Sequence, residues 1–304
     1  MKEEFYIASG DETQQLHCVA WIPEQQPVAV LQLVHGMEEY IARYEPLAKE
    51  MVGRGWAVIG HDHLGHGQSG RWERGFFTER SDGDAILIGD IKRVNQLARE
   101  RWQNIPVMVF GHSMGSFFVR RFLALYPDSS DGTVICGSGW YNVLETGVAY
   151  WAARIIGGIK GWHSRSRLLT AICSLPFLFA FRKEGRFAWL SKNKVNVASY
   201  EADPLCGFGF TCGGYLHMYR NLLLVSQHDH YDQLKPIPLL VVSGAEDPVG
   251  GREAVPKIAA DYRRRGFDDV TERVVADNRH EILFELEETE TIGFIADWLD
   301  QRRG

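Results

Sequence analysis

The chain has 304 residues, of which 45% are hydrophobic and 24% are charged. This composition excludes a disordered or fibrous protein and is typical of a globular one, and the length allows one large domain or a domain with an insertion. The formal charge of −6 at pH 7 argues against nucleic acid as the main partner, because phosphate binding requires a dense basic face.

In chain order, strand-like and helix-like segments alternate. The first segments, 5–8 and 17–22, are typical of an antiparallel edge. Three continuous apolar runs then predict strands that are covered on both faces, at 28–34, 56–59 and 106–110. Helical spacing predicts helices over 82–102 and 117–126, and a further strand follows at 133–136.

The same alternation returns near the end of the chain. It predicts strands at 239–242 and 270–275 and helices at 253–265 and 291–301. Such alternation favours an α/β fold, with a mainly parallel sheet and helices on both faces.

Residues 141–234 interrupt this order, because they are rich in aromatic and large apolar residues and contain no convincing strand. Residues 168–181 are almost wholly apolar, but Pro176 interrupts this short run, which suits a buried or interfacial segment better than a membrane span. The interruption carries ten Lys or Arg and six Asp or Glu, a net charge of +4, which leaves −10 for the remainder. We predict that 141–234 is an inserted, mainly helical cap, and that 1–140 and 235–304 form the core.

Two features bear on the compartment and on bound groups. The acidic residues 1–5 lack the basic region and apolar run of a signal peptide, so we expect a cytoplasmic protein. Five cysteines at irregular separations fit neither a zinc module nor a compact disulfide framework, so we expect free thiols. The sequence implies no metal or organic cofactor.

The pentapeptide Gly111-His112-Ser113-Met114-Gly115 lies between a predicted strand and a predicted helix. Gly111 and Gly115 allow the strained turn that raises a serine hydroxyl above a sheet. The helix that follows also favours developing negative charge at its N-terminus. This context predicts that Ser113 is a nucleophile.

An earlier strand ends in His35-Gly36-Met37, where a glycine allows the backbone to approach a substrate closely. The backbone N–H groups of Met37 and Met114 are the candidate donors of an oxyanion hole, which stabilises the negative oxygen formed during acyl transfer. The alternative is that His35 and Gly36 are only a strand end with a hydrogen-bonded core histidine.

Two later strand ends supply the remaining groups that acyl transfer needs. Asp247 follows the apolar strand 239–242 in an Asp-Pro turn, which is alternatively an ordinary surface turn, and Glu246 is the second candidate. His280 lies between a strand and the last helix, where a loop can deliver an imidazole. The order Ser113, Asp247, His280 is that of one hydrolase architecture and differs from the chymotrypsin and subtilisin orders.

With these residues in view, the chain resembles the monoacylglycerol lipase and lysophospholipase branch of the α/β-hydrolase superfamily. The resemblance spans nearly the whole chain and is strongest around His35-Gly36-Met37, Asp62 to Ser69, Gly111 to Gly115, Gly244 to Pro248 and Arg279-His280-Glu281. It implies a helical cap over an apolar acyl tunnel at 141–234. It also implies that Asp62 to Ser69 is a structural turn, and this stretch lacks the Gly-Lys-Ser ending of a phosphate-binding loop.

The expected activity is therefore a serine carboxylic-ester hydrolase that acts through an acyl-enzyme on a single-chain lipid ester, a monoacylglycerol or a lysophospholipid. The apolar and basic cap suggests transient contact with a membrane surface. Two alternatives stay open, because a fold does not fix its function: an aminopeptidase or acyltransferase that uses the same three residues, and a non-catalytic binding protein.

Overall fold

A computed structural model describes residues 1–303, so Gly304, with which the predicted core ends, lies outside the described residues. One sheet contains the strands β1 (Lys2–Ala8), β2 (Gln15–Trp21), β3 (Val30–Val34), β4 (Ala57–His61), β5 (Val107–His112), β6 (Thr133–Cys136), β7 (Leu239–Gly244) and β8 (Val270–Val275). Their spatial order is β1-β2-β4-β3-β5-β6-β7-β8. The pairs β1–β2 and β2–β4 are antiparallel and all other neighbours are parallel, as the alternation predicts.

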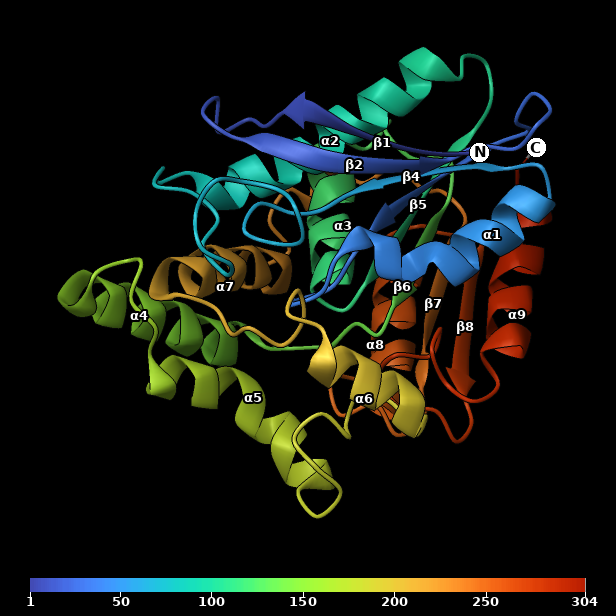
Figure 1. Ribbon diagram of the computed structural model, residues 1–304. Helices are drawn as coiled ribbons and strands as arrows, with labels where there is room; N and C mark the ends of the chain where they lie inside the picture. Colours follow the sequence, from blue (N-terminus) through green and yellow to red (C-terminus); the bar gives the residue numbers. More distant parts are fainter. Residues whose placement is uncertain (304) are drawn as a thin grey trace.

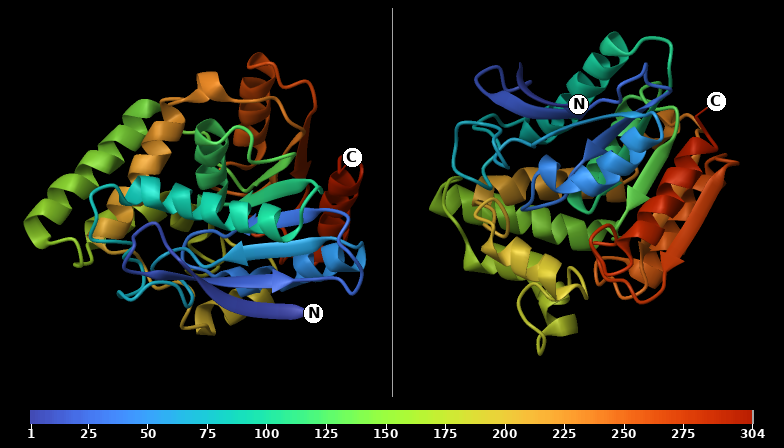
Figure 2. Two further views of the ribbon diagram at one scale, coloured as in Figure 1. Left: turned by 90° about the horizontal axis from the view of Figure 1, so that it is seen from above. Right: turned by 45° about the vertical axis from the view of Figure 1, so that its right-hand side comes forward.

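Helices cover both faces of this sheet because successive side chains of a strand point to opposite faces. Val30 and Val34 of β3 join one core cluster, and Leu31 and Leu33 join another. The helices α1 (Glu45–Gly53) and α9 (Glu288–Asp300) pack on one face. The opposite face carries α2 (Gly83–Arg101), α3 (Met114–Leu125) and α8 (Gly251–Arg264), and Figure 2 shows both layers.

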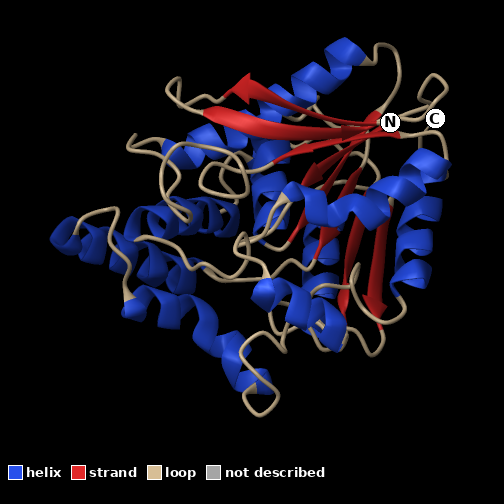
Figure 3. Ribbon diagram, in the orientation of Figure 1, coloured by secondary structure: helices blue, strands red, loops and turns tan. Residues whose placement is uncertain are grey.

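The predicted cap forms the helices α4 (Val143–Lys160), α5 (Arg167–Phe181), α6 (Lys194–Ala202) and α7 (Cys212–Ser226). They gather at the lower left of Figure 1, on the side of the sheet where the parallel strands end. Helix and loop alone form this region in Figure 3, whereas the strands stay together in the sheet. Two short 3₁₀ helices, η1 (Ile41–Tyr44) and η2 (Tyr231–Gln233), complete the described elements.

The element boundaries differ from the sequence predictions at several places. Helix α3 begins at Met114 rather than at residue 117, because the turn at Ser113 leads directly into it. Helix α1 has no counterpart among the predicted elements, although Pro46 in its first turn is a helix-start signal. The apolar run 168–181 is a helix with one buried side, which includes Leu169, and one exposed side, which includes Leu168, Leu175 and Phe179.

Candidate active site

Ser113 lies in a strained turn between β5 and α3, with φ of 52° and ψ of −122°. A Cβ atom on Gly115 would overlap the carbonyl oxygens of Val34 and His35, so only glycine fits where this turn meets β3. The turn leaves the Ser113 hydroxyl outside the helix, and its Oγ lies 2.7 Å from Nε2 of His280.

Asp247 completes a continuous chain of hydrogen bonds with His280 and Ser113. Its Oδ1 lies 2.9 Å from Nδ1 of His280, and its carboxylate also accepts hydrogen bonds from Ser243 Oγ at 2.6 Å and from the Val249 N–H at 2.8 Å. Burial alone would raise the pKa of Asp247, but His280 and these hydrogen bonds outweigh it and lower the pKa. An ionised Asp247 accepts a hydrogen bond from Nδ1–H of His280, which places the unprotonated Nε2 toward the Ser113 hydroxyl.

Met37 and Met114 border the same cavity as Ser113. Because Met114 is the first residue of α3, no carbonyl group of the helix accepts a hydrogen bond from its N–H. The Met37 N–H makes no backbone hydrogen bond within the described part of the chain. Both groups are therefore available to an oxyanion.

His35 and Gly36 hold the loop that carries Met37. Nδ1 of His35 donates to the carbonyl oxygen of Gly36 at 2.8 Å, and its Nε2 accepts the His63 N–H at 2.9 Å. The Gly36 N–H donates to Oε1 of Glu39 at 2.7 Å. His35 is thus a hydrogen-bonded core histidine that also fixes the backbone beside Ser113.

A buried ionic cluster that the sequence does not predict lies next to the loop that carries Met37. Arg43 donates to Glu39 at 2.7 Å and to both carboxylate oxygens of Glu281 at 2.7 and 3.0 Å. Glu39 and Arg43 stand four residues apart, a signal that the sequence does offer. Glu281 follows His280 directly, so Arg43 links the loop that carries Met37 to the backbone of the catalytic-histidine candidate.

His112, the second residue of the pentapeptide, lies in the same cluster. Its Nδ1 lies 3.4 Å from Oε1 of Glu39, and its Nε2 lies 3.2 Å from the carbonyl oxygen of His280. Burial would lower the pKa of His112, but the contact with Glu39 outweighs it and raises the pKa. With an acceptor near each nitrogen, His112 joins Glu39 to the backbone of His280.

The histidine loop, residues 278–285, is bonded to the predicted cap as well as to the core. The Glu281 N–H donates to the carbonyl oxygen of Leu190 at 2.7 Å, and Arg279 donates to that of Ala188 at 2.6 Å. The ring of Trp189 lies 5.0 Å from that of His280, centroid to centroid. Residues 188–190 therefore help to fix the position of the imidazole.

A cluster of neutral histidines packs behind the loop that carries Met37. His61 and His66 are fully buried, and burial lowers the pKa of each to about 3. Burial also lowers the pKa of His35 and of His63, whose ring centroids are 4.3 Å apart. The turn from Asp62 to Ser69 therefore serves as structural support.

This cluster should make the protein sensitive to acid. The unfolded chain takes up protons on His61 and His66 below pH 6.5, whereas the folded chain does so only near pH 3, so stability falls as the pH drops through this window. At pH 4.5 each histidine should cost about 3 kcal/mol of unfolding free energy. Urea unfolding at pH 7.5 and 4.5 measures the loss.

Two variants check the source of this acid sensitivity. His61→Leu should flatten the pH dependence of stability because both nitrogens of His61 lack hydrogen-bond partners. His230→Gln alters a largely exposed histidine and should leave it unchanged. Equal slopes in all three proteins would contradict the explanation.

A cavity of about 770 Å³ opens beside Ser113 and His280. This volume suits a small organic ligand. One end is formed by α4 and α7 and is mainly apolar, with Val148, Met218 and Leu222 among its side chains, although Glu145 of α4 also lines it. The other end contains polar and charged groups, including Glu38, Arg186, Tyr200 and Glu281.

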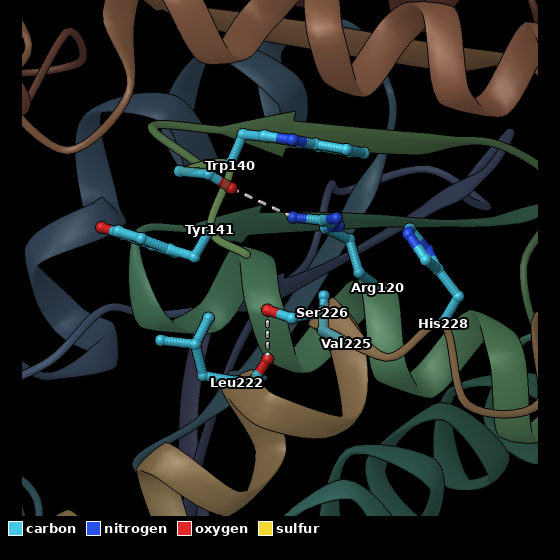
Figure 4. Close-up of a pocket in the computed structure, with 8 residues that line it drawn as sticks. Arg120, Trp140, Tyr141, Leu222, Val225, Ser226 and His228 are labelled. Atoms are coloured by element: carbon cyan, nitrogen blue, oxygen red, sulfur yellow. Dashed lines mark hydrogen bonds between the residues drawn. The ribbon is translucent and has the colours of Figure 1, made fainter. Parts of the chain in front are cut away.

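A second, much smaller cavity lies between α3, α7 and the segment after β6, and Figure 4 shows its side chains. Arg120 donates to the carbonyl oxygen of Gly139 there at 3.2 Å, and Ser226 donates to its own helix. It contains none of Ser113, Asp247 and His280. The larger cavity is therefore the candidate active site.

Within residues 1–303, no group of three or more His, Cys, Asp or Glu side chains is placed to hold a metal ion. No helix in that range combines the length and the hydropathy that crossing a bilayer demands. Glu246, the second candidate for the acid, pairs with Lys192 at 2.7 Å.

Residues 25–287 match the family model described as serine aminopeptidase, S33. The chain is 26% identical over 286 residues to a monoacylglycerol lipase of Mycolicibacterium smegmatis, covering 92% of this chain and 90% of that protein. It is 26% identical over 239 residues to the human monoglyceride lipase, covering 77% and 70%. A carboxyl esterase of Bacillus coagulans has the same fold, with a TM-score of 0.91 and 19% identity over 100% of this chain and 99% of that one.

These comparisons confirm the predicted fold class. The match to the family model covers most of the chain, and the sheet order and flanking helices agree with it. The chain therefore belongs to the serine aminopeptidase S33 family of α/β-hydrolases, in its monoacylglycerol lipase-like branch.

Proposed function

We propose that the protein is a serine ester hydrolase in which Ser113 is the nucleophile, His280 its general base and Asp247 the residue that orients the base. The observation that carries this proposal is the unbroken hydrogen-bond chain from Asp247 through His280 to Ser113, which ends in the large cavity. His280 takes the Ser113 proton, Oγ attacks the ester carbonyl, and the N–H groups of Met37 and Met114 hold the oxyanion. Water activated by His280 then releases the acid from the acyl-enzyme.

The substrate we propose is a single-chain lipid ester. The apolar end of the cavity offers space for one acyl chain, and the polar end lies beside His280, where the leaving alcohol must take up its proton. The names of the relatives support the same class. Residues 141–234 act in this proposal as a cap over a core formed by 1–140 and 235–304.

Two assays separate this proposal from its alternatives. A fluorophosphonate probe should label the protein covalently, and a non-catalytic binding protein would stay unlabelled. Nitrophenyl esters of graded chain length should be hydrolysed faster than aminoacyl anilides. A preference for the anilides would instead support an aminopeptidase, which the family description also names.

We further propose that the cap touches anionic membrane surfaces. Helix α4 exposes large apolar side chains at Leu144, Val148, Trp151, Ile155 and Ile159, whose spacing of three or four residues places them on one face. The exposed face of α5 extends this apolar patch. Because the cap carries a net charge of +4, a negatively charged bilayer is the surface that it fits.

Replacing both Trp151 and Ile155 with Glu should lower binding to phosphatidylglycerol vesicles at least tenfold, because two apolar anchors become charges. Neither residue lines the cavity, so hydrolysis of a soluble nitrophenyl ester should persist. Leu286→Glu, which changes an exposed residue outside the cap, is the matched control. Equal binding of the unmodified protein to anionic and neutral vesicles in a flotation assay would refute the docking.

A further inference from the structure

Glu38 follows the oxyanion candidate Met37 and adopts a backbone conformation that favours glycine, with φ of 57°. A side chain in this region has a conformational cost, and such costs persist where the surroundings or the function require them. Among the described residues, none of the cationic groups lies within salt-bridge distance of the Glu38 carboxylate. The strained residue therefore gains no ion pair from its side chain.

A series of contacts places Glu38 at the polar end of the cavity. The Tyr200 hydroxyl donates to the carbonyl oxygen of Glu38 at 2.9 Å, and the rings of Tyr200 and Phe187 lie 5.2 Å apart. The guanidinium of Arg186 lies over Phe187 at 4.7 Å from the ring centroid. Glu38, Tyr200, Phe187 and Arg186 all line the cavity, so a leaving alcohol that occupied this end would meet them.

The carboxylates of Glu39 and Glu281 each pair with a buried cation, whereas that of Glu38 makes no ion pair among the described residues. Glu39 and Glu281 share the buried guanidinium of Arg43. Burial raises the pKa of Glu38, and hydrogen bonding from Gly209 with the charges of Arg186 and Arg165 only partly offsets this. Arg186 itself is exposed at the rim. The Glu38 carboxyl group therefore borders the cavity without an ion pair, among mainly apolar side chains.

We propose that Glu38 determines specificity by accepting hydrogen bonds from uncharged head groups and repelling anionic ones. This inference rests on the proposed ester hydrolase function and distinguishes between the two substrate classes that the sequence leaves open. The Glu38 carboxylate accepts hydrogen bonds from free hydroxyl groups on the leaving alcohol. A phosphate in the same place meets a like charge at low dielectric, which disfavours lysophospholipids.

A matched pair of substrates isolates the effect of charge. We would compare 1-octanoylglycerol with the same ester phosphorylated on the terminal hydroxyl, both below their micelle concentrations, and use nitrophenyl octanoate as the reference without a polar head group. The unmodified protein should prefer the uncharged ester by roughly 100-fold in kcat/KM. Glu38→Gln keeps the size and one acceptor but removes the charge, and it should reduce this preference at least tenfold.

Three further variants sharpen the comparison. Glu38→Gly relieves the backbone strain, so it should fold at least as well and show the same loss of preference. Arg186→Gln removes a nearby positive charge and should increase the preference. Glu201→Gln changes an exposed carboxylate on α6 that does not line the cavity, and it should leave the preference unchanged.

The outcomes separate this inference from the proposed function. If nitrophenyl octanoate is hydrolysed but Glu38→Gln and Glu38→Gly keep the unmodified preference within twofold, the role of Glu38 is refuted and the ester hydrolase stands. Equal use of both lipids by the unmodified protein refutes it in the same way. If nitrophenyl octanoate is not hydrolysed at all, the proposed function fails, and the inference fails with it.

Discussion

Replacing Ser113 with Ala should lower ester hydrolysis by a factor on the order of 10⁴ to 10⁶. The hydroxyl that lies 2.7 Å from His280 is the only atom the variant removes, and no other described group occupies that position. The backbone of the turn is held by the Ser113 N–H, which donates to the carbonyl oxygen of Cys136 at 2.9 Å, so the fold should persist. Steady-state hydrolysis of nitrophenyl octanoate and circular dichroism measure the two effects.

Fluorophosphonate labelling provides an independent readout of the same variant, since the probe bonds to the nucleophile itself. Labelling should disappear in Ser113→Ala and persist in Ser130→Ala, which alters a buried serine just before the amino end of β6. A folded Ser113→Ala protein that still hydrolyses the ester at an appreciable rate would require another nucleophile.

Asp247→Asn should lower kcat by a factor of about 10⁴ at neutral pH, because an amide neither fixes the Nδ1–H tautomer of His280 nor stabilises its cation. The lowered pKa of Asp247 means that the carboxylate stays charged below its usual range, so protonation of Asp247 should not set the acid limit of activity near neutral pH. Stopped-flow and steady-state assays of the acylation step measure the loss.

Substitutions at two residues near Asp247 provide comparisons for the loss of activity in Asp247→Asn. Ser243→Ala removes one hydrogen bond to the carboxylate but leaves its charge, so the loss should be nearer tenfold. Glu246→Gln changes the residue that pairs with Lys192 and should reduce activity less than twofold. If Glu246→Gln proved more damaging than Asp247→Asn, the orienting residue would have to be reassigned.

The fold could be predicted from the sequence because its signals are local. Continuous apolar runs such as 106–110 indicate buried strands, and parallel strands bring their carboxyl ends to one edge. Ser113, Asp247 and His280 each follow such a strand, which is why residues so far apart in the chain could be expected at one place. The start of α3 at Met114 is less predictable, because a strained turn can begin a helix without a capping residue.

The buried ionic cluster could not be predicted, because its partners are set by packing. Arg43 and Glu281 are 238 positions apart, and no local pattern indicates that they pair. The surroundings of Glu38 depend in the same way on how α6 and the loop before it settle on the core. The sequence shows a carboxylate beside Met37 but not whether a cation neutralises it.

The hydrogen bonds between residues 188–190 and the histidine loop join one side of the cavity directly to the segment that carries His280. We expect that displacing this stretch would move the peptide next to His280 and weaken the contact of the imidazole with Ser113. The end of α5 also contacts the histidine loop, because the guanidinium of Arg279 lies 3.9 Å from the ring centroid of Phe181. Helix α4 makes no hydrogen bond to the histidine loop among the described residues. We therefore expect substrate to enter and product to leave on the α4 side of the cavity, where no contact with the histidine loop has to break.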